Sequence, residues 1–188
     1  MSRRMSIKMP LLALLFVAFA FGETHASQVA TMEGIGPVKI GMTVKEAEHA
    51  LGAKLDPISP EFYKECWVTS RSDKKDRVIQ YRIEDENIAA IDVYPRAAET
   101  LPLPIPAIKT AEGIGVGSTE EEIKRAYGKS AKKERAPYFD ETDKDPEYWI
   151  HVDNPDKKLG MIFDVRYGRV LSFSVGTLEA INRMEGCN

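Results

Sequence analysis

Apolar and polar residues alternate in two separate stretches of the chain, residues 78–94 and 161–176. A period of two predicts β-strands that bury one face. A polar or glycine-containing turn interrupts each stretch, at 85–87 and at 167–169, so each predicts a β-hairpin. A shorter apolar run, 66–70 or 148–150, precedes each hairpin and predicts one more strand. The inward residues expected in the hairpins are Ile79, Tyr81, Ile83, Ala89, Ile91, Val93, Met161, Phe163, Val165, Leu171, Phe173 and Val175.

The second stretch repeats the first 82 residues further on, with an apolar residue at every matched inward position. A second repeat lies upstream, where residues 41–52 recur as residues 117–128. Both copies contain Thr and, three residues later, Glu, which is the spacing of a helix capping box, and both end in Gly. The sequence therefore predicts helices at 44–51 and 120–127.

Each copy thus contains a helix followed by three strands, too little apolar surface to be stable alone. We expect an α+β fold in which two tandem helix–β–β–β repeats form a two-layer sandwich. Its antiparallel sheet would have about six strands, with both helices on one face. Repeat 1 spans 27–98, a proline-rich linker spans 99–110, and repeat 2 with a C-terminal tail spans 111–188.

Residues 1–26 have the pattern of a signal peptide: a basic start, an apolar run over 11–21 and small residues at 24 and 26. An uncleaved anchor is the alternative, although a membrane span needs roughly 20 apolar residues. We expect a periplasmic or secreted protein with no transmembrane segment in the mature chain.

The mature chain contains Cys66 and Cys187, and an even count in an exported protein predicts a disulfide bond. A zinc site is the alternative, but it needs four ligands, and only His49 and His151 could join the cysteines. We therefore expect a Cys66–Cys187 disulfide, no metal and no cofactor.

The net charge and the motifs of the chain argue against several classes of function. The formal net charge of −3 argues against binding to nucleic acid. His151 and Asp153 share one side of a strand and could orient a base, but the chain has no Gly-x-Ser-x-Gly nucleophile motif. The glycine-rich turns lack the Lys-Ser/Thr pair of a phosphate loop, and segment 140–145 lacks the central glycine of a calcium loop. We predict no enzyme activity and no catalytic residue.

The outward face of the predicted sheet offers a binding surface instead. Tryptophan, tyrosine and arginine dominate the energetics of protein interfaces. The alternative is that the linker or the C-terminal tail covers the two tryptophans as a satellite core. The candidate binding residues are Trp67, Arg82, Tyr94, Trp149, His151, Asp164 and Arg166.

The run from Gly34 to Gly52, Gly-Ile-Gly…Ile-Gly-Met-Thr-x-x-Glu-Ala…Leu-Gly, resembles exported bacterial proteins of the SmpA/OmlA and β-lactamase-inhibitor-protein type. The resemblance implies protein–protein binding through an exposed sheet surface. We therefore expect an exported protein-binding module, an inhibitor or an envelope assembly factor, whose partner is another envelope or extracellular protein. The alternatives are a structural domain, or a small hydrolase or ligand-binding protein that uses His151 and Asp153. The sequence does not predict the oligomeric state.

Overall fold

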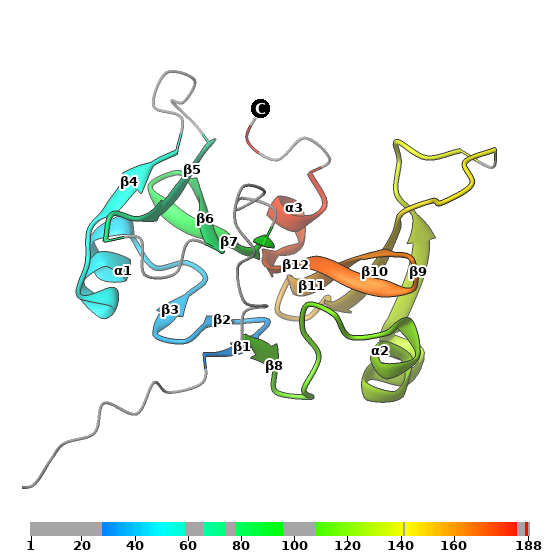
Figure 1. The fold of residues 1–188 in the computed structure, drawn as a ribbon. Coiled ribbons are helices and arrows are strands. Elements are labelled where there is room, and N and C mark those ends of the chain that lie inside the picture. The colour runs from blue at the N-terminus through cyan, green and yellow to red at the C-terminus, as the bar shows by residue number, and fades with distance from the viewer. Residues whose placement is uncertain are drawn as a thin grey trace, which may run out of the picture.

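The computed structural model describes residues 28–58, 66–73, 78–95, 108–140, 142–183 and 187. The predicted signal peptide and most of the predicted linker lie outside the described residues. Figure 1 shows an eight-stranded sheet across the molecule, with a small four-stranded sheet beneath its middle.

The eight-stranded sheet has the order β4-β5-β6-β7-β12-β11-β10-β9, and every neighbouring pair is antiparallel. Each half therefore runs in chain order from an outer edge to the centre, where β7 and β12 pair. The bounds are β4 Leu55–Pro57, β5 Cys66–Arg71, β6 Ile79–Glu84, β7 Asn87–Val93, β9 Ala131–Arg135, β10 Tyr148–Asn154, β11 Leu159–Arg166 and β12 Arg169–Thr177.

The small sheet joins segments that precede the two helices. Its order is β3-β2-β1-β8, with bounds β1 Val29–Thr31, β2 Gly34–Ile35, β3 Val38–Lys39 and β8 Lys109–Thr110. Strands β1 and β8 are parallel, so the second half of the chain contributes one strand to it. Gly34 is required here because a Cβ at this position would lie 2.1 Å from the carbonyl oxygen of Val38.

The predicted helices are confirmed as α1 (Val44–Leu51) and α2 (Glu120–Tyr127). Thr43 and Thr119 cap them, and each forms a reciprocal capping box with the Glu three residues later. A 3-10 turn, η2 (Gly128–Ser130), follows α2, and a short helix, α3 (Leu178–Ile181), follows β12.

We expect Thr119→Ala to lower the free energy of unfolding by about 1 kcal/mol, because it leaves the N–H of Glu122 without its side-chain acceptor. The hydroxyl of Thr119 accepts from the N–H of Glu122 at 3.2 Å. Urea denaturation measures the loss. Thr119→Ser keeps the hydroxyl and should change stability by a few tenths of a kcal/mol at most, as roughly expected for equivalent caps. Equal losses in the two variants would contradict a capping role.

Acid should weaken both caps. Hydrogen bonds from the backbone N–H groups of Thr43 and Thr119 hold the pKa of Glu46 and Glu122 below the ordinary value of 4.5. A carboxylate whose pKa is lower in the folded state stabilises the fold above its unfolded pKa, and this contribution is lost as the pH falls through the folded pKa.

Glu46→Gln/Glu122→Gln keeps the capping-box pattern but removes the titration. Its stability should therefore fall less steeply than that of the wild type below about pH 4.5. Stability measured by denaturation at a series of pH values tests this. Glu86→Gln/Glu121→Gln makes the same charge change outside the boxes, and an equally shallow curve for it would contradict the assignment.

The main core lies on one face of the eight-stranded sheet, which we call the core face. Helices α1 and α2 and the small sheet cover it, with Ala47 and Ile123 as the buried helix residues. A second cluster lies on the opposite face, where α3 packs against the central strands. The second cluster contains Ala89, Ala90, Ile162, Ala180 and Ile181, with Trp149 and Leu178 packed against it.

The expected two-layer α+β sandwich of helix–β–β–β repeats is wrong. The protein is mostly β, with sheets of eight and four strands and only three short α-helices among the described residues. Strand β9 was not predicted because Lys132, Lys133, Glu134 and Arg135 make it look like a solvated loop. The strands of the small sheet have only two or three residues each and form through pairing across the fold, which short-range patterns do not predict.

Two β-bulges also change the predicted inward positions. Arg82 pairs with Ala90 and Ile83 with Ile88, which leaves Ala89 as the extra residue. Ile88 and Val170 occupy the inward positions in place of Ala89 and Leu171. The bulges stand 82 residues apart in the chain, at matched positions of the two hairpins. The remaining ten predicted inward residues are buried in the main core.

Candidate functional site

A cleft of about 610 Å³ lies on the face opposite the core face. We call it the sheet cleft. Residues of β5, β6 and β7, together with Ile181, Arg183 and Cys187, form one wall, and residues of β10, β11 and β12 form the other. The residues that line it are Val68, Gln80, Arg82, Asp92, Val93, Tyr94, Trp149, Ile162, Asp164, Ser172, Phe173, Ser174, Ile181, Arg183 and Cys187.

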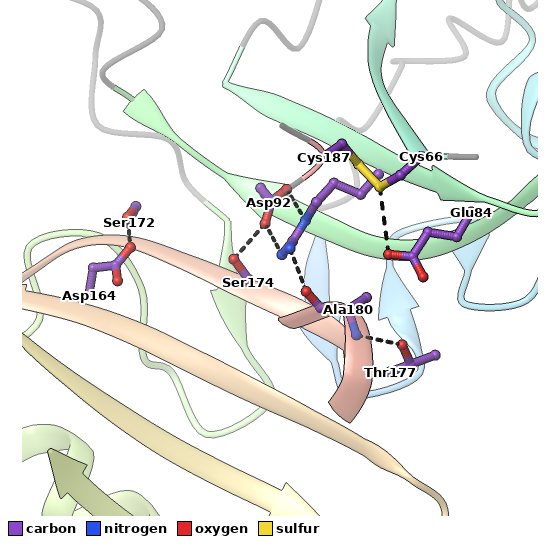
Figure 2. A network of polar contacts seen from close by, with 10 residues as sticks. Cys66, Glu84, Asp92, Asp164, Ser172, Ser174, Thr177, Ala180 and Cys187 are labelled. Carbon is purple, nitrogen blue, oxygen red and sulfur yellow. Dashed lines mark hydrogen bonds and ion pairs between the residues drawn. A yellow bond between two sulfur atoms is a disulfide. The ribbon is translucent and has the colours of Figure 1, made fainter. Parts of the chain in front are cut away.

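An ion pair on β6 and β7 forms part of the cleft. Arg82 is buried, and its Nε and Nη2 donate to the two carboxylate oxygens of Asp92 at 2.9 and 2.8 Å. Its Nη1 donates to the carbonyl oxygen of Ala180 at 2.6 Å, which fastens α3 to the sheet. Ser174 donates to Asp92 at 2.5 Å, so the network also joins the central strands (Figure 2).

The predicted cysteine pair lies in the same wall of the cleft as the Arg82–Asp92 ion pair. The Sγ atoms of Cys66 and Cys187 are 1.97 Å apart, at disulfide-bonding distance, as the sequence predicted. Figure 2 shows the bond beside Glu84 and near Asp92. Arg183 pairs with Glu84 at 3.3 Å. Arg183 and Cys187 are therefore held against β6 and β5, and Cys187 itself lines the cleft.

The opposite wall carries an aromatic residue beside a carboxylate. Trp149 on β10 pairs directly across the sheet with Asp164 on β11, and Ser172 donates a hydrogen bond to Asp164. Trp149 is half-buried and packs against the second cluster, so it belongs partly to a satellite core and partly to the cleft.

Trp67 lies on the core face, contrary to the prediction that it points outward with Trp149. It pairs with Ile83 and packs against the main core, whereas its neighbour Val68 pairs with Arg82 and lines the cleft. On β5, Val68 and not Trp67 therefore occupies the position that matches Trp149 on β10. Strand β5 is thus shifted by one residue relative to β10. Because side chains alternate with a period of two, a one-residue shift moves every side chain to the other face.

His151 is buried beside the cleft wall but does not line the cleft. Its Nε2 lies 2.8 Å from Oε1 of Glu134 on β9, and its ring meets the Trp149 ring edge-on at 6.2 Å. The sequence suggested Asp153 as its partner. The structure pairs it with Glu134 instead, and this contact was missed because β9 was not predicted.

Arg166 lies outside the cleft, further along β11. Its guanidinium stacks 5.5 Å from the ring of Phe139 and 5.2 Å from the ring of Tyr167. Of the seven candidate binding residues, the cleft brings together Arg82, Tyr94, Trp149 and Asp164. Ile181, Arg183 and Cys187 were missed as lining residues. The predicted disulfide was the signal that the tail returns to this sheet.

The described part of the chain contains no group of three or more His, Cys, Asp or Glu residues arranged to hold a metal ion. None of its helices is long and apolar enough to cross a membrane.

No family model, curated protein or solved structure matches the chain. The resemblance to the SmpA/OmlA and β-lactamase-inhibitor-protein types therefore stays a prediction. The cysteine pair at bonding distance is compatible with an extracytoplasmic protein, since disulfides persist in oxidising compartments.

Proposed function

We propose that the protein is an exported protein-binding module, periplasmic or secreted, that receives a segment of another envelope or extracellular protein in the sheet cleft. The observation that carries the proposal is the cleft itself, which is lined by Trp149 and Tyr94 together with the fixed charged pair Arg82 and Asp92. Aromatic anchors beside satisfied polar groups are the residue combination typical of interface hot spots.

One wall of the cleft is held in place by bonds within the protein. This favours a binding function over the alternative of a purely structural domain. The Arg82–Asp92 pair, the Arg82–Ala180 hydrogen bond and the disulfide fix one wall before any partner arrives. A preformed site loses less conformational entropy on association, so more of the contact energy appears as affinity.

The edges of the eight-stranded sheet favour the cleft over strand addition as the binding mode. Strand β4 has three residues and ends in Pro57, and β9 presents Lys132 and Lys133. Short edge strands, proline and lysine are the features by which proteins discourage edge-to-edge pairing.

Capture from an envelope or culture-fluid extract tests the proposal. Immobilised wild type should retain a partner that Trp149→Ala and Tyr94→Ala fail to retain. Tyr138→Ala, at a side chain 66% exposed and outside the cleft lining, should retain it like the wild type. Circular dichroism checks that each variant is folded. Equal retention by all four proteins would overturn the sheet cleft as the binding surface.

A further inference from the structure

We infer that the guanidinium of Arg166, held against the rings of Phe139 and Tyr167, binds a carboxylate of the partner protein. This contact would be a second point of attachment, outside the lining of the sheet cleft. The inference rests on the proposed function, because that function names the source of the carboxylate. It goes beyond that function because it assigns a ligand chemistry to a residue that the cleft does not include.

Arg166 lies on the same face of the eight-stranded sheet as the cleft. It follows Asp164, which lines the cleft, by two residues on β11. Side chains two residues apart in a strand point to the same face, with about 7 Å of strand between them. A partner segment that occupies the cleft can therefore reach Arg166 along one face of the sheet.

The guanidinium of Arg166 has no ion-pair partner among the described residues. Its Nε is buried without a hydrogen-bond acceptor, whereas its two Nη groups are not among the buried atoms and form the open edge of the side chain. Five other described arginines are held within the protein: Arg71, Arg82 and Arg183 by carboxylates, and Arg135 and Arg169 by carbonyl oxygens. A half-buried cation without an anion is costly, so Arg166 is suited to an anion from outside the chain.

Two aromatic rings hold this guanidinium in place without using its N–H donors. The centre of the guanidinium lies 5.5 Å from the ring centroid of Phe139 and 5.2 Å from that of Tyr167. A planar guanidinium binds a carboxylate through two parallel N–H···O hydrogen bonds. Because the rings fix the side chain beforehand, less conformational entropy is lost when a carboxylate arrives.

Tyr167 is an unfavourable residue for its turn. Tyr167 and Gly168 have φ angles of 52° and 71°, the pattern of a type I′ hairpin turn, which favours Asn or Asp before Gly. A bulky residue at positive φ is uncommon. The side chain of Tyr167 is also 70% exposed, so burial in a core does not explain it. Its contact with Arg166 does.

Acetate tests the site without the natural partner. The readout is the Nε–H signal of Arg166 in ¹⁵N-labelled protein, assigned by its loss in Arg166→Lys, with sodium chloride keeping the ionic strength constant. We expect acetate to shift this signal with saturation at roughly 10–100 mM, the range for one charge-assisted contact. The Nε–H signal of Arg82 should not move, because Asp92 already supplies its carboxylate. Acetamide, the neutral isostere, should move neither signal.

Tyr167→Asn removes the ring but suits the turn. It should weaken acetate binding roughly three- to tenfold, because the guanidinium is no longer immobilised in advance. Asp85→Asn makes a substitution to the same residue at the matched turn 82 residues earlier, where φ is 47°, and it should bind acetate like the wild type.

An unmoved Arg166 signal, an equal shift of the Arg82 signal, an equal response to acetamide, or unchanged acetate binding in Tyr167→Asn would each overturn the inference. In the capture experiment, Arg166→Gln should retain less partner than the wild type. Acetate binding combined with full retention by Arg166→Gln would indicate a free carboxylate as the ligand and would overturn the contact with the partner.

Failure of this inference is distinguishable from failure of the proposed function. If acetate does not bind but Trp149→Ala and Tyr94→Ala still fail to retain the partner, only the contact at Arg166 is lost from the account. If both of those variants retain the partner, the sheet cleft loses its role, whatever acetate does at Arg166.

Discussion

The double variant Cys66→Ser/Cys187→Ser is expected to unfold about 3–5 kcal/mol more easily than the oxidised wild type. The bond joins residues 121 positions apart and therefore closes most of the chain into one loop. Such a cross-link removes many conformations from the unfolded chain, and its loss returns that entropy to the unfolded state. Equilibrium denaturation in guanidinium chloride, at equal protein concentration, measures the difference.

Mass spectrometry establishes the bond before stability is compared. Alkylation of the unreduced, denatured protein should add no mass, and two adducts without reductant would show that the cysteines are free. For the stability measurement, a loss below about 1 kcal/mol would contradict the expected effect, since native disulfides of small exported domains contribute several times more. The wild type under reductant should match the double variant.

Arg82→Ala is expected to lower the free energy of unfolding by about 3 kcal/mol, because it leaves the carboxylate of Asp92 without its cation in a largely buried place. The side chains of Arg82 and Asp92 are only 9% and 18% exposed. The substitution also removes the hydrogen bond that fastens the carbonyl of Ala180 to the sheet. Thermal and urea denaturation measure the loss.

Replacement of both partners separates the charge effect from packing. Arg82→Met/Asp92→Leu keeps the volume and leaves no unpaired charge, and buried pairs replaced in this way are often neutral or even stabilising. We therefore expect the double variant to be more stable than Arg82→Ala. A double variant that loses more than the single one would contradict the view that the uncompensated carboxylate causes the damage.

The helices were predictable because their signals are local. Thr43 and Thr119, each with a Glu three residues on and a Gly at the end, define the start and end of a helix within about ten residues. The four strands of the two central hairpins were predictable from alternation. The small sheet and the outer strands β4 and β9 were not, because their pairing depends on contacts between segments distant in the chain.

The site was partly predictable for a related reason. Alternation places Arg82, Trp149 and Asp164 correctly because each follows the register of its own strand. Trp67 was placed on the wrong face because residue spacing alone does not reveal the one-residue shift of β5 against β6. The wall made by Ile181 and Arg183 depends on the tail folding back over the sheet, which the cysteine pair indicated only in outline.

The proposed function places the partner in the sheet cleft and not on another surface. Its most direct test is the affinity of the captured and purified partner for two variants, Trp149→Ala and Trp67→Ala, at a temperature where both are folded. We predict that Trp149→Ala weakens binding by about 2 kcal/mol or more, the hot-spot range. We also predict that Trp67→Ala, although less stable, binds like the wild type. Full affinity in Trp149→Ala, or an equal loss in both variants, would contradict the account.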